Sequence, residues 1–226
     1  MSLTQLTSQE DTYPVLITRL PYAAQYKPEP ILKEIDKIDL RGLICLSMPL
    51  HIESPNNGGR LIYELEKAGL ILIAKIAWYR DRHIVTTKSK RLTNTWEPIA
   101  IFSKNKNYVI NREAVTKVKK GFEGREGAFD EEEFQTCFGD HWPVRNDRRD
   151  RRFLPAMVVL NCGQLADLQK GETVYDPYGN PGIRDTCHYI GWKYIDGNLP
   201  NAARHAKRAK ESINYANENL PGIGRD

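Results

Sequence analysis

The sequence predicts an α/β protein in which a mainly parallel β-sheet is covered by helices. Short segments of continuous apolar character alternate along the chain with segments whose apolar residues recur at helical spacing, which is typical of strands joined by helical crossovers. The strand segments lack the polar alternation of a half-exposed sheet, which indicates that both faces are covered. With 226 residues, 40% of them hydrophobic, the chain is long enough for one sizeable core.

The first 79 residues contain the clearest alternation. The predicted strands are Thr12–Thr18, Gly42–Leu50 and Leu70–Tyr79, each a continuous apolar run. Pro28–Ile38 is predicted to be a helix because prolines stand near its start and isoleucines recur at helical spacing. Arg60–Leu70 is predicted to be a second helix, which follows an Asn-Asn-Gly-Gly turn and ends at a glycine.

Residues 80–152 differ in character from the rest of the chain. They are polar and rich in charge, and two short segments, Pro98–Ser103 and Asn107–Asn111, carry most of their apolar character. We expect an insertion with little core of its own. The predicted organisation is therefore residues 1–79, an insertion at 80–152 and residues 153–226, with the first and last parts forming one domain in space.

Regular structure is predicted again after the insertion. Met157–Gly171 has the apolar pattern of a helix and is closed by a glycine. Thr173–Asp176 and Lys193–Asp196 are short apolar strands, and Pro200–Asn219 is an Ala-rich helix.

The composition points to a cytoplasmic protein without a metal. No apolar run approaches the roughly 20 residues of a membrane helix, and Met1–Asp11 lacks the apolar core of a signal peptide. Histidines show no metal-ligand spacing. The cysteines form no Cys-x-x-Cys pair, so we expect reduced thiols; they are Cys45, Cys137, Cys162 and Cys187.

Basic residues gather in three clusters, at 80–91, 145–152 and 204–210, although the net charge is only +4. Clusters that the fold brings together form a surface that follows nucleic-acid phosphates, whereas separate clusters are solvated loops or helix faces. We take the first two as the candidate nucleic-acid-binding residues. They are Arg80, Arg82, Lys88, Lys90, Arg91, Arg145, Arg148, Arg149, Arg151 and Arg152.

The segment Glu172–Asp185, ETVYDPYGNPGIRD, has the pattern of a ligand loop. A buried strand ends in Asp-Pro-Tyr, and a glycine-bearing turn follows it. In α/β proteins this arrangement delivers a carboxylate and a tight loop to the edge of the sheet, where ligands bind. Taken alone, the pattern also fits a strand-ending turn without a ligand.

Taken with other segments in order, this loop resembles the cofactor loop of the β-class DNA amino-methyltransferases. ITRLPY at Ile17–Tyr22 stands at the position of the family's catalytic segment, and YDPYGNPG at Tyr175–Gly182 at that of the S-adenosylmethionine loop. WEPIAIFSK, RRFLPAMVVL and IGWKYIDGN resemble further family segments. The resemblance spans nearly the whole chain, although no motif is intact. It implies a methyltransferase-like (Rossmann-like) sheet of seven strands with one reversed, and a target-recognition region at 80–152.

The catalytic segment departs from the family pattern at Arg19, Leu20, Pro21 and Tyr22. In the family, an Asp or Asn oxygen and a proline carbonyl accept hydrogen bonds from the amine of a flipped base, and the aromatic residue stacks on that base. Here Arg19 takes the acceptor position and Leu20 the first proline position. Arginine has only donors, so we expect the central acceptor to be missing. Asp11 or Gln25 is the alternative source of an acceptor.

The resemblance also implies a set of cofactor-binding residues. In the loop, Asn180 and Pro181 replace a glycine and a small hydroxyl residue, and Pro181 removes an N–H that a ligand would use. We expect the binding of S-adenosylmethionine to be weak or lost. The implied residues are Asp176, Pro177, Tyr178, Gly179, Gly182, Asp196, Asn198 and Phe153.

Three hypotheses for the function follow. The leading one is a DNA-binding member of the family without methyl transfer of its own, working beside an active methyltransferase subunit or as a homodimer. The second is an active DNA adenine-N6 or cytosine-N4 methyltransferase whose acceptor comes from elsewhere in the chain. The third is a DNA-binding or assembly protein that no longer binds the cofactor. No membrane partner is expected.

Overall fold

A computed structural model describes residues 12–23, 25–51, 54–79, 96–113, 141–142, 154, 156–197 and 199 of the chain. Several predicted features lie outside these residues. They are the basic clusters at 80–91, 145–152 and 204–210, the helix at 200–219, and Asp11, Cys137, Phe153 and Asn198.

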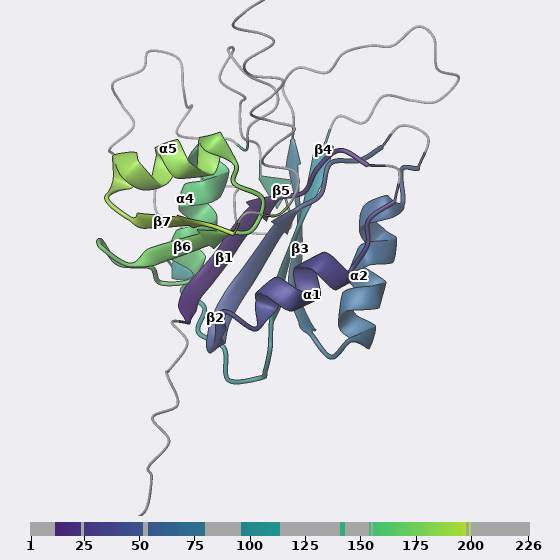
Figure 1. Ribbon diagram of the computed structural model, residues 1–226, viewed down its shortest axis with the longest axis horizontal. Coiled ribbons are helices and arrows are strands. Elements are labelled where there is room, and N and C mark those ends of the chain that lie inside the picture. Colours follow the sequence, from purple (N-terminus) through teal and green to yellow (C-terminus); the bar gives the residue numbers. More distant parts are fainter. Residues whose placement is uncertain are drawn as a thin grey trace, which may run out of the picture.

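The centre of the fold is a seven-stranded sheet with the strand order β5-β3-β4-β2-β1-β6-β7 (Figure 1). β4 is antiparallel to both of its neighbours, β2 and β3, and every other pairing is parallel. The predicted mainly parallel sheet with one reversed strand is therefore confirmed. The strands are β1 (Tyr13–Arg19), β2 (Ile38–Ser47), β3 (Ile71–Tyr79), β4 (Trp96–Ser103), β5 (His141–Trp142), β6 (Thr173–Asp176) and β7 (Lys193–Asp196).

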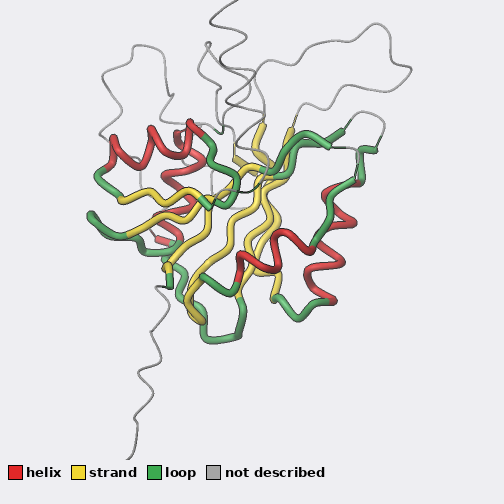
Figure 2. Tube along the Cα trace, viewed as in Figure 1, coloured by secondary structure: helices red, strands yellow, loops and turns green. Residues whose placement is uncertain are grey.

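Helices cover both faces of this sheet (Figures 1 and 2). The side chains of β1 alternate between two hydrophobic clusters: Val15 and Ile17 pack with α4 and α5, and Leu16 packs with α1 and α2. None of the described helices is long and apolar enough to cross a membrane. The helices are α1 (Glu29–Ile35), α2 (Asn57–Lys67), α4 (Ala156–Leu165) and α5 (Pro181–Ile190).

The ends of three predicted helices are different in the structure. The helix predicted at Met157–Gly171 is α4, which ends at Leu165, and Asp167 just after it has a positive φ of 55°. The first helix stops at Ile35, and Ile38 begins β2, because the backbone at Lys37 already pairs with Tyr13 of β1. The predicted Asn-Asn-Gly-Gly turn is partly helical, since α2 begins at Asn57.

β4 lies in the middle of the sheet although it falls within the predicted insertion. Its residues Ile99–Phe102 are buried, and the strand pairs with β2 on one side and β3 on the other. The expectation of little core is therefore wrong for this segment. Most other residues of 80–152 lie outside the described part, so the proposed division of the chain stays a prediction.

The burial of β4 makes a prediction about stability. Phe102 is 0% exposed and lies between Ile44 of β2 and Leu72 of β3, so Phe102→Ala should lower the free energy of unfolding by about 3–5 kcal/mol. Leu40→Ala is the control, because Leu40 lies in β2 but is 68% exposed. For the control, urea denaturation should show that the free energy of unfolding changes by no more than about 0.5 kcal/mol. Equal effects of the two changes would contradict a central position of β4.

Candidate cofactor and catalytic site

The ends of β1 and β6 meet at the point where the strand order reverses. The connection from β1 through α1 leads to β2 on one side, whereas that from β6 through α5 leads to β7 on the other. In open α/β sheets, ligands bind outside the carboxyl ends of the strands at such a point. Arg19 ends β1 and Asp176 ends β6, so the predicted catalytic and cofactor segments lie at the same edge.

The Asp176 carboxylate is buried and accepts hydrogen bonds from three parts of the chain. Thr18 Oγ1 of β1 donates to Oδ1 at 2.5 Å, and Tyr194 OH of β7 donates to Oδ2 at 3.1 Å. The backbone N–H groups of Tyr178 and Asn180 donate at 3.1 and 2.5 Å. Burial raises the pKa of Asp176, and the hydrogen bonds from Thr18, Asn180 and Tyr178 oppose that shift by stabilising the charge. The carboxylate therefore ties β1, β7 and its own loop together.

The loop after β6 directs its backbone donors inward. The N–H of Gly179 donates to the Asp176 carbonyl at 3.3 Å, and the N–H groups of Tyr178 and Asn180 bind the Asp176 carboxylate. Pro181, the next residue, has no N–H. Gly179 has φ +63°, and a Cβ there would lie 2.4 Å from Asp196 Oδ2, so the tight turn requires glycine.

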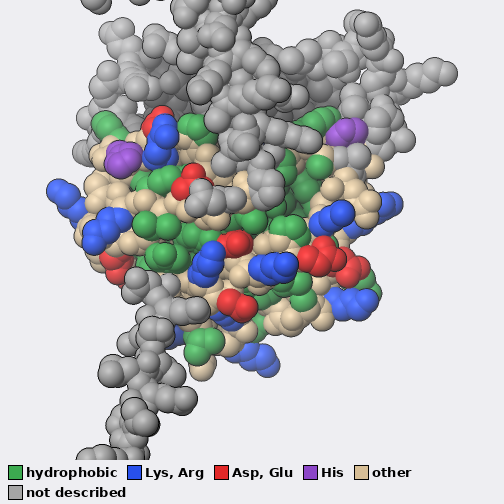
Figure 3. All heavy atoms as spheres, viewed as in Figure 1, with side chains coloured by type: hydrophobic (Ala, Val, Ile, Leu, Met, Phe, Trp, Pro, Cys, Tyr) green, Lys and Arg blue, Asp and Glu red, His purple; other side chains and the backbone are tan. Residues whose placement is uncertain are grey.

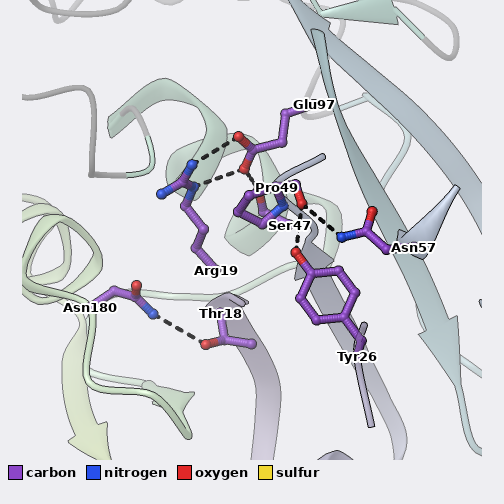
Figure 4. Close-up of polar contacts among 8 residues, drawn as sticks. All are labelled: Thr18, Arg19, Tyr26, Ser47, Pro49, Asn57, Glu97 and Asn180. Atoms are coloured by element: carbon purple, nitrogen blue, oxygen red, sulfur yellow. Dashed lines mark hydrogen bonds and ion pairs between the residues drawn. The ribbon is translucent and has the colours of Figure 1, made fainter. Parts of the chain in front are cut away.

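The side chain of Asn180 extends the same network across the strand ends. Its Nδ2 lies 3.0 and 3.1 Å from the two Asp176 carboxylate oxygens. The same Nδ2 lies 3.2 Å from Thr18 Oγ1 (Figure 4). Asn180 is itself buried. An amide side chain of the protein thus occupies the space between the ends of β1 and β6.

The remaining predicted cofactor residues lie around this loop. Pro177 and Tyr178 form its turn, and Gly182 is the second residue of α5. Asp196 ends β7 directly beside Asp176 in the strand register, and its exposed carboxylate packs against Gly179. Asp196 is therefore the predicted acid that the structure brings to the loop.

Arg19 forms a bidentate ion pair with Glu97. Its Nε lies 2.8 Å from Glu97 Oε1 and its Nη2 2.9 Å from Oε2, and Ser47 Oγ donates to Oε1 at 2.7 Å (Figure 4). Glu97 is 1% exposed. Burial by itself lowers the pKa of Arg19, but the charge and hydrogen bonds of Glu97 outweigh it, so the pKa is raised and the guanidinium stays charged.

The reversed direction of β4 explains how Glu97 reaches Arg19. Glu97 stands at the start of β4, and the start of an antiparallel strand lies at the carboxyl ends of its parallel neighbours. The sequence analysis missed Glu97 and Ser47. A signal was present, because Glu97 is a single carboxylate at the start of an apolar strand, and a buried charge needs a partner.

The other residues of the catalytic segment occupy different environments. Leu20 is buried, and its N–H donates to the Ser47 carbonyl at 2.9 Å. Pro21 is half-buried and Tyr22 is 60% exposed. The segment therefore presents one aromatic ring to solvent, while Arg19 points to Glu97.

The described residues include no group of three His, Cys, Asp or Glu that could hold a metal ion. Cys45, Cys162 and Cys187 are buried thiols.

Comparisons with known proteins agree with this architecture. A family model described as DNA methylase matches residues 29–188. A comparison with curated proteins finds no match.

Three solved structures are similar in fold. PvuII DNA methyltransferase (cytosine-N4-specific) is 12% identical, with 83% of this chain and 75% of that chain covered at a TM-score of 0.61. M1.HpyAVI is 14% identical, with 89% of each chain covered at a TM-score of 0.58. A Thermus thermophilus protein described as a DNA modification methylase, complexed with S-adenosyl-L-methionine, is 19% identical, with 95% and 90% covered at a TM-score of 0.53.

The Arg19–Glu97 pair makes a prediction about stability. Arg19→Ala should lower the free energy of unfolding by about 3–5 kcal/mol, because it leaves the buried Glu97 carboxylate without its cation. The matched control is Arg184→Ala, which removes an arginine from an exposed ion pair with Asp185. This change should lower the free energy of unfolding by less than about 1 kcal/mol. Urea denaturation measures both changes.

Changing both partners together provides a further check. Arg19→Met combined with Glu97→Gln should recover most of the lost stability, because no buried charge remains and Ser47 keeps an acceptor. If Arg19→Ala is no more harmful than Arg184→Ala, the ion pair is not formed in solution.

Proposed function

The chain belongs to the DNA methylase family, and on this premise we propose that it binds DNA without transferring methyl groups itself. The observation that carries the proposal is the buried Arg19–Glu97 pair at the position of the family's catalytic acceptor.

The chemistry of methyl transfer explains why this pair matters. The lone pair of an exocyclic base amine is delocalised into the ring, so the amine needs a hydrogen-bond acceptor before it can attack a methyl sulfonium. Arg19 has donors only. Glu97 Oε1 already accepts from Arg19 and Ser47, and the Glu97 side chain is buried. Neither residue is therefore placed to accept a hydrogen bond from a flipped base.

The loop after β6 also does not fit tight binding of S-adenosylmethionine. The N–H groups of Tyr178, Gly179 and Asn180 donate to Asp176, and Pro181 has none. Asp196, an exposed carboxylate that ends β7 beside Gly179, is the proposed acceptor for a ligand hydroxyl. We therefore infer that the cofactor binds weakly or not at all.

The DNA-binding part of the proposal rests on the family and on the basic clusters of the sequence. Over α1 and α2, the described acidic and basic side chains are interspersed on the face shown in Figure 3, which does not favour this face as a phosphate surface. The clusters at 80–91 and 145–152 are the proposed phosphate contacts.

We propose an active methyltransferase subunit as the partner, with a second copy of this chain as the alternative. In this arrangement the protein positions DNA for a subunit that carries the missing acceptor. The buried thiols fit a reducing compartment, so the proposed location is the cytoplasm.

The protein alone should transfer no radiolabelled methyl group from S-adenosylmethionine to DNA. Arg19→Asn combined with Glu97→Gln should restore transfer if the cofactor binds, because this pair supplies an amide acceptor and leaves no buried charge unpaired. Leu20 is kept, since proline would remove its N–H bond to Ser47. Groups that position and activate a reacting amine typically raise the rate by about 10²- to 10⁴-fold, so the difference in methyl transfer between the unaltered protein and the double variant should be measurable.

Calorimetric titration with S-adenosylmethionine is the control for this experiment. Loss of a charge-assisted hydrogen bond corresponds to about one to two decades in affinity, so we expect weak binding. Transfer by the unaltered protein that is abolished by Tyr22→Ala or Gln25→Ala would overturn the proposal and establish an active enzyme.

Binding to duplex DNA should weaken steeply as salt concentration rises. The logarithm of the binding constant should fall with the logarithm of the salt concentration, with a slope of about −0.9 for each phosphate neutralised. Replacing the four arginines of residues 148–152 with alanine should weaken the binding of all duplex sequences about equally. The control is Lys33→Ala with Lys67→Ala, on the exposed surfaces of α1 and α2, which should leave affinity unchanged. Negligible affinity at low salt would refute DNA binding.

A further inference from the structure

Asn180 stands at the start of α5 but does not cap the helix with its side chain. Its backbone has φ −76° and ψ 118°, and its carbonyl accepts the N–H groups of Ile183 and Arg184 at 3.0 and 3.1 Å. The side chain of an asparagine at this position typically accepts an N–H of the first helical turn. Here it makes no such hydrogen bond and turns inward to Asp176 instead.

The Asp176 carboxylate has enough donors without this side chain. An ionised carboxylate offers about four lone-pair sites to donors. Thr18 Oγ1 and Tyr194 OH supply two donors. The backbone N–H groups of Tyr178 and Asn180 supply two more. The side-chain Nδ2 of Asn180, at 3.0 and 3.1 Å from the two oxygens, is therefore surplus to the needs of the buried charge.

The amide of Asn180 also has more acceptors around it than it has hydrogens. Its Nδ2 carries two hydrogens, and it lies within 3.2 Å of three oxygens, which are both carboxylate oxygens of Asp176 and Oγ1 of Thr18 (Figure 4). The residue is only 5% exposed. A donor held among acceptors from the ends of β1 and β6 lies where the polar end of a ligand would bind in an open α/β sheet.

We propose that Asn180 is an internal substitute for a ligand. Its side-chain amide fills the position beside Asp176 and Thr18 and keeps the donor-bearing end of a small molecule away from them. The family pattern has a glycine at this position, so the amide is a property of this chain. The inference rests on the proposed weak binding of S-adenosylmethionine and adds its cause, which is a built-in contact that excludes the ammonium group of the amino-acid end.

Removal of the amide should free this position without unfolding the protein. Four donors to Asp176 remain, so the buried charge keeps its partners. The backbone torsions at Asn180 are accessible to any residue. A ligand ammonium in place of the amide would add the attraction of opposite charges to its hydrogen bonds, which the neutral amide lacks.

The test is calorimetric titration of the full chain with S-adenosylmethionine. Asn180→Ala should raise the affinity by about 10- to 100-fold, because the gain corresponds to one charge-assisted hydrogen bond. If Asn180→Ala does not fold, Asn180→Gly takes its place, because glycine is accepted at the start of a helix. The second ligand is 5′-methylthioadenosine, which has no ammonium group and should gain nothing. An equal gain for both ligands would overturn the proposal.

Two further variants separate the amide from general effects. Asn111→Ala is the matched control, because it removes an amide–carboxylate hydrogen bond of 2.8 Å to Asp167 beside the end of α4, and it should leave the affinity unchanged. Tyr194→Phe removes a donor to Asp176 but keeps the amide of Asn180 in place, so it should not raise the affinity. A gain equal to that of Asn180→Ala would attribute the effect to a loosened carboxylate and refute the inference.

Hydrogen exchange tests the amide in the unaltered protein, whatever the variants do. The side-chain NH₂ group of Asn180 should exchange with D₂O about tenfold or more slowly than that of Asn56, because Asn56 is exposed. Resolved side-chain signals in an NMR spectrum give both rates. Equal rates would show that the amide of Asn180 is not held inside the protein, and the inference would fail.

The outcomes distinguish this inference from the proposed function. If the unaltered protein binds S-adenosylmethionine weakly and Asn180→Ala binds no better, the amide is not the obstacle, whereas the proposed function stands. If the unaltered protein already binds the cofactor tightly, the proposed weak binding fails and the inference with it. Asn180→Ala should still transfer no methyl group to DNA, because the Arg19–Glu97 pair is unchanged.

Discussion

A buried carboxylate needs hydrogen-bond donors on every side, and the part of the sheet around β1, β6 and β7 is arranged to supply them to Asp176. Thr18 comes from β1 and Tyr194 from β7, and the loop after β6 contributes its own N–H groups. The same donors are those that a bound anion or polar ligand would require. The stability of this edge and its capacity for a ligand therefore depend on the same atoms.

Arg19 and Glu97, on the other side of β1, are also charged groups that need a partner in the interior. Each neutralises a charge that would be unfavourable if left alone in the interior, and together they join β1 to β4. The carboxyl end of β1 is thus fixed from two directions, by a carboxylate in β6 and by a carboxylate in β4. A pocket that had to admit a substrate would leave one of these partners free to bind it.

The sequence predicted the type and order of most described elements, because apolar runs mark β1, β2 and β3, and Pro or Gly lies near many ends. It placed β4 in an insertion with little core. It missed α5, because Pro181 at its first residue was taken as part of the ligand loop, and Gly191 after its last residue as part of a segment that resembles a family strand. Arg19 was singled out from the sequence as the departure from the family pattern, and this stays a prediction. Its partner could not be predicted, because Glu97 lies 78 residues away and becomes a neighbour only through the reversed strand.

The central place of β1 has a consequence for synthesis of the chain. Its two neighbours come from opposite ends of the sequence, β2 directly after it and β6 from Thr173 onward. A growing chain can therefore pair one edge of β1 early, whereas the other edge stays open until β6 has left the ribosome. During that interval β1 exposes an unpaired apolar edge, which favours aggregation, so we expect a chaperone to matter most before β6 has been made.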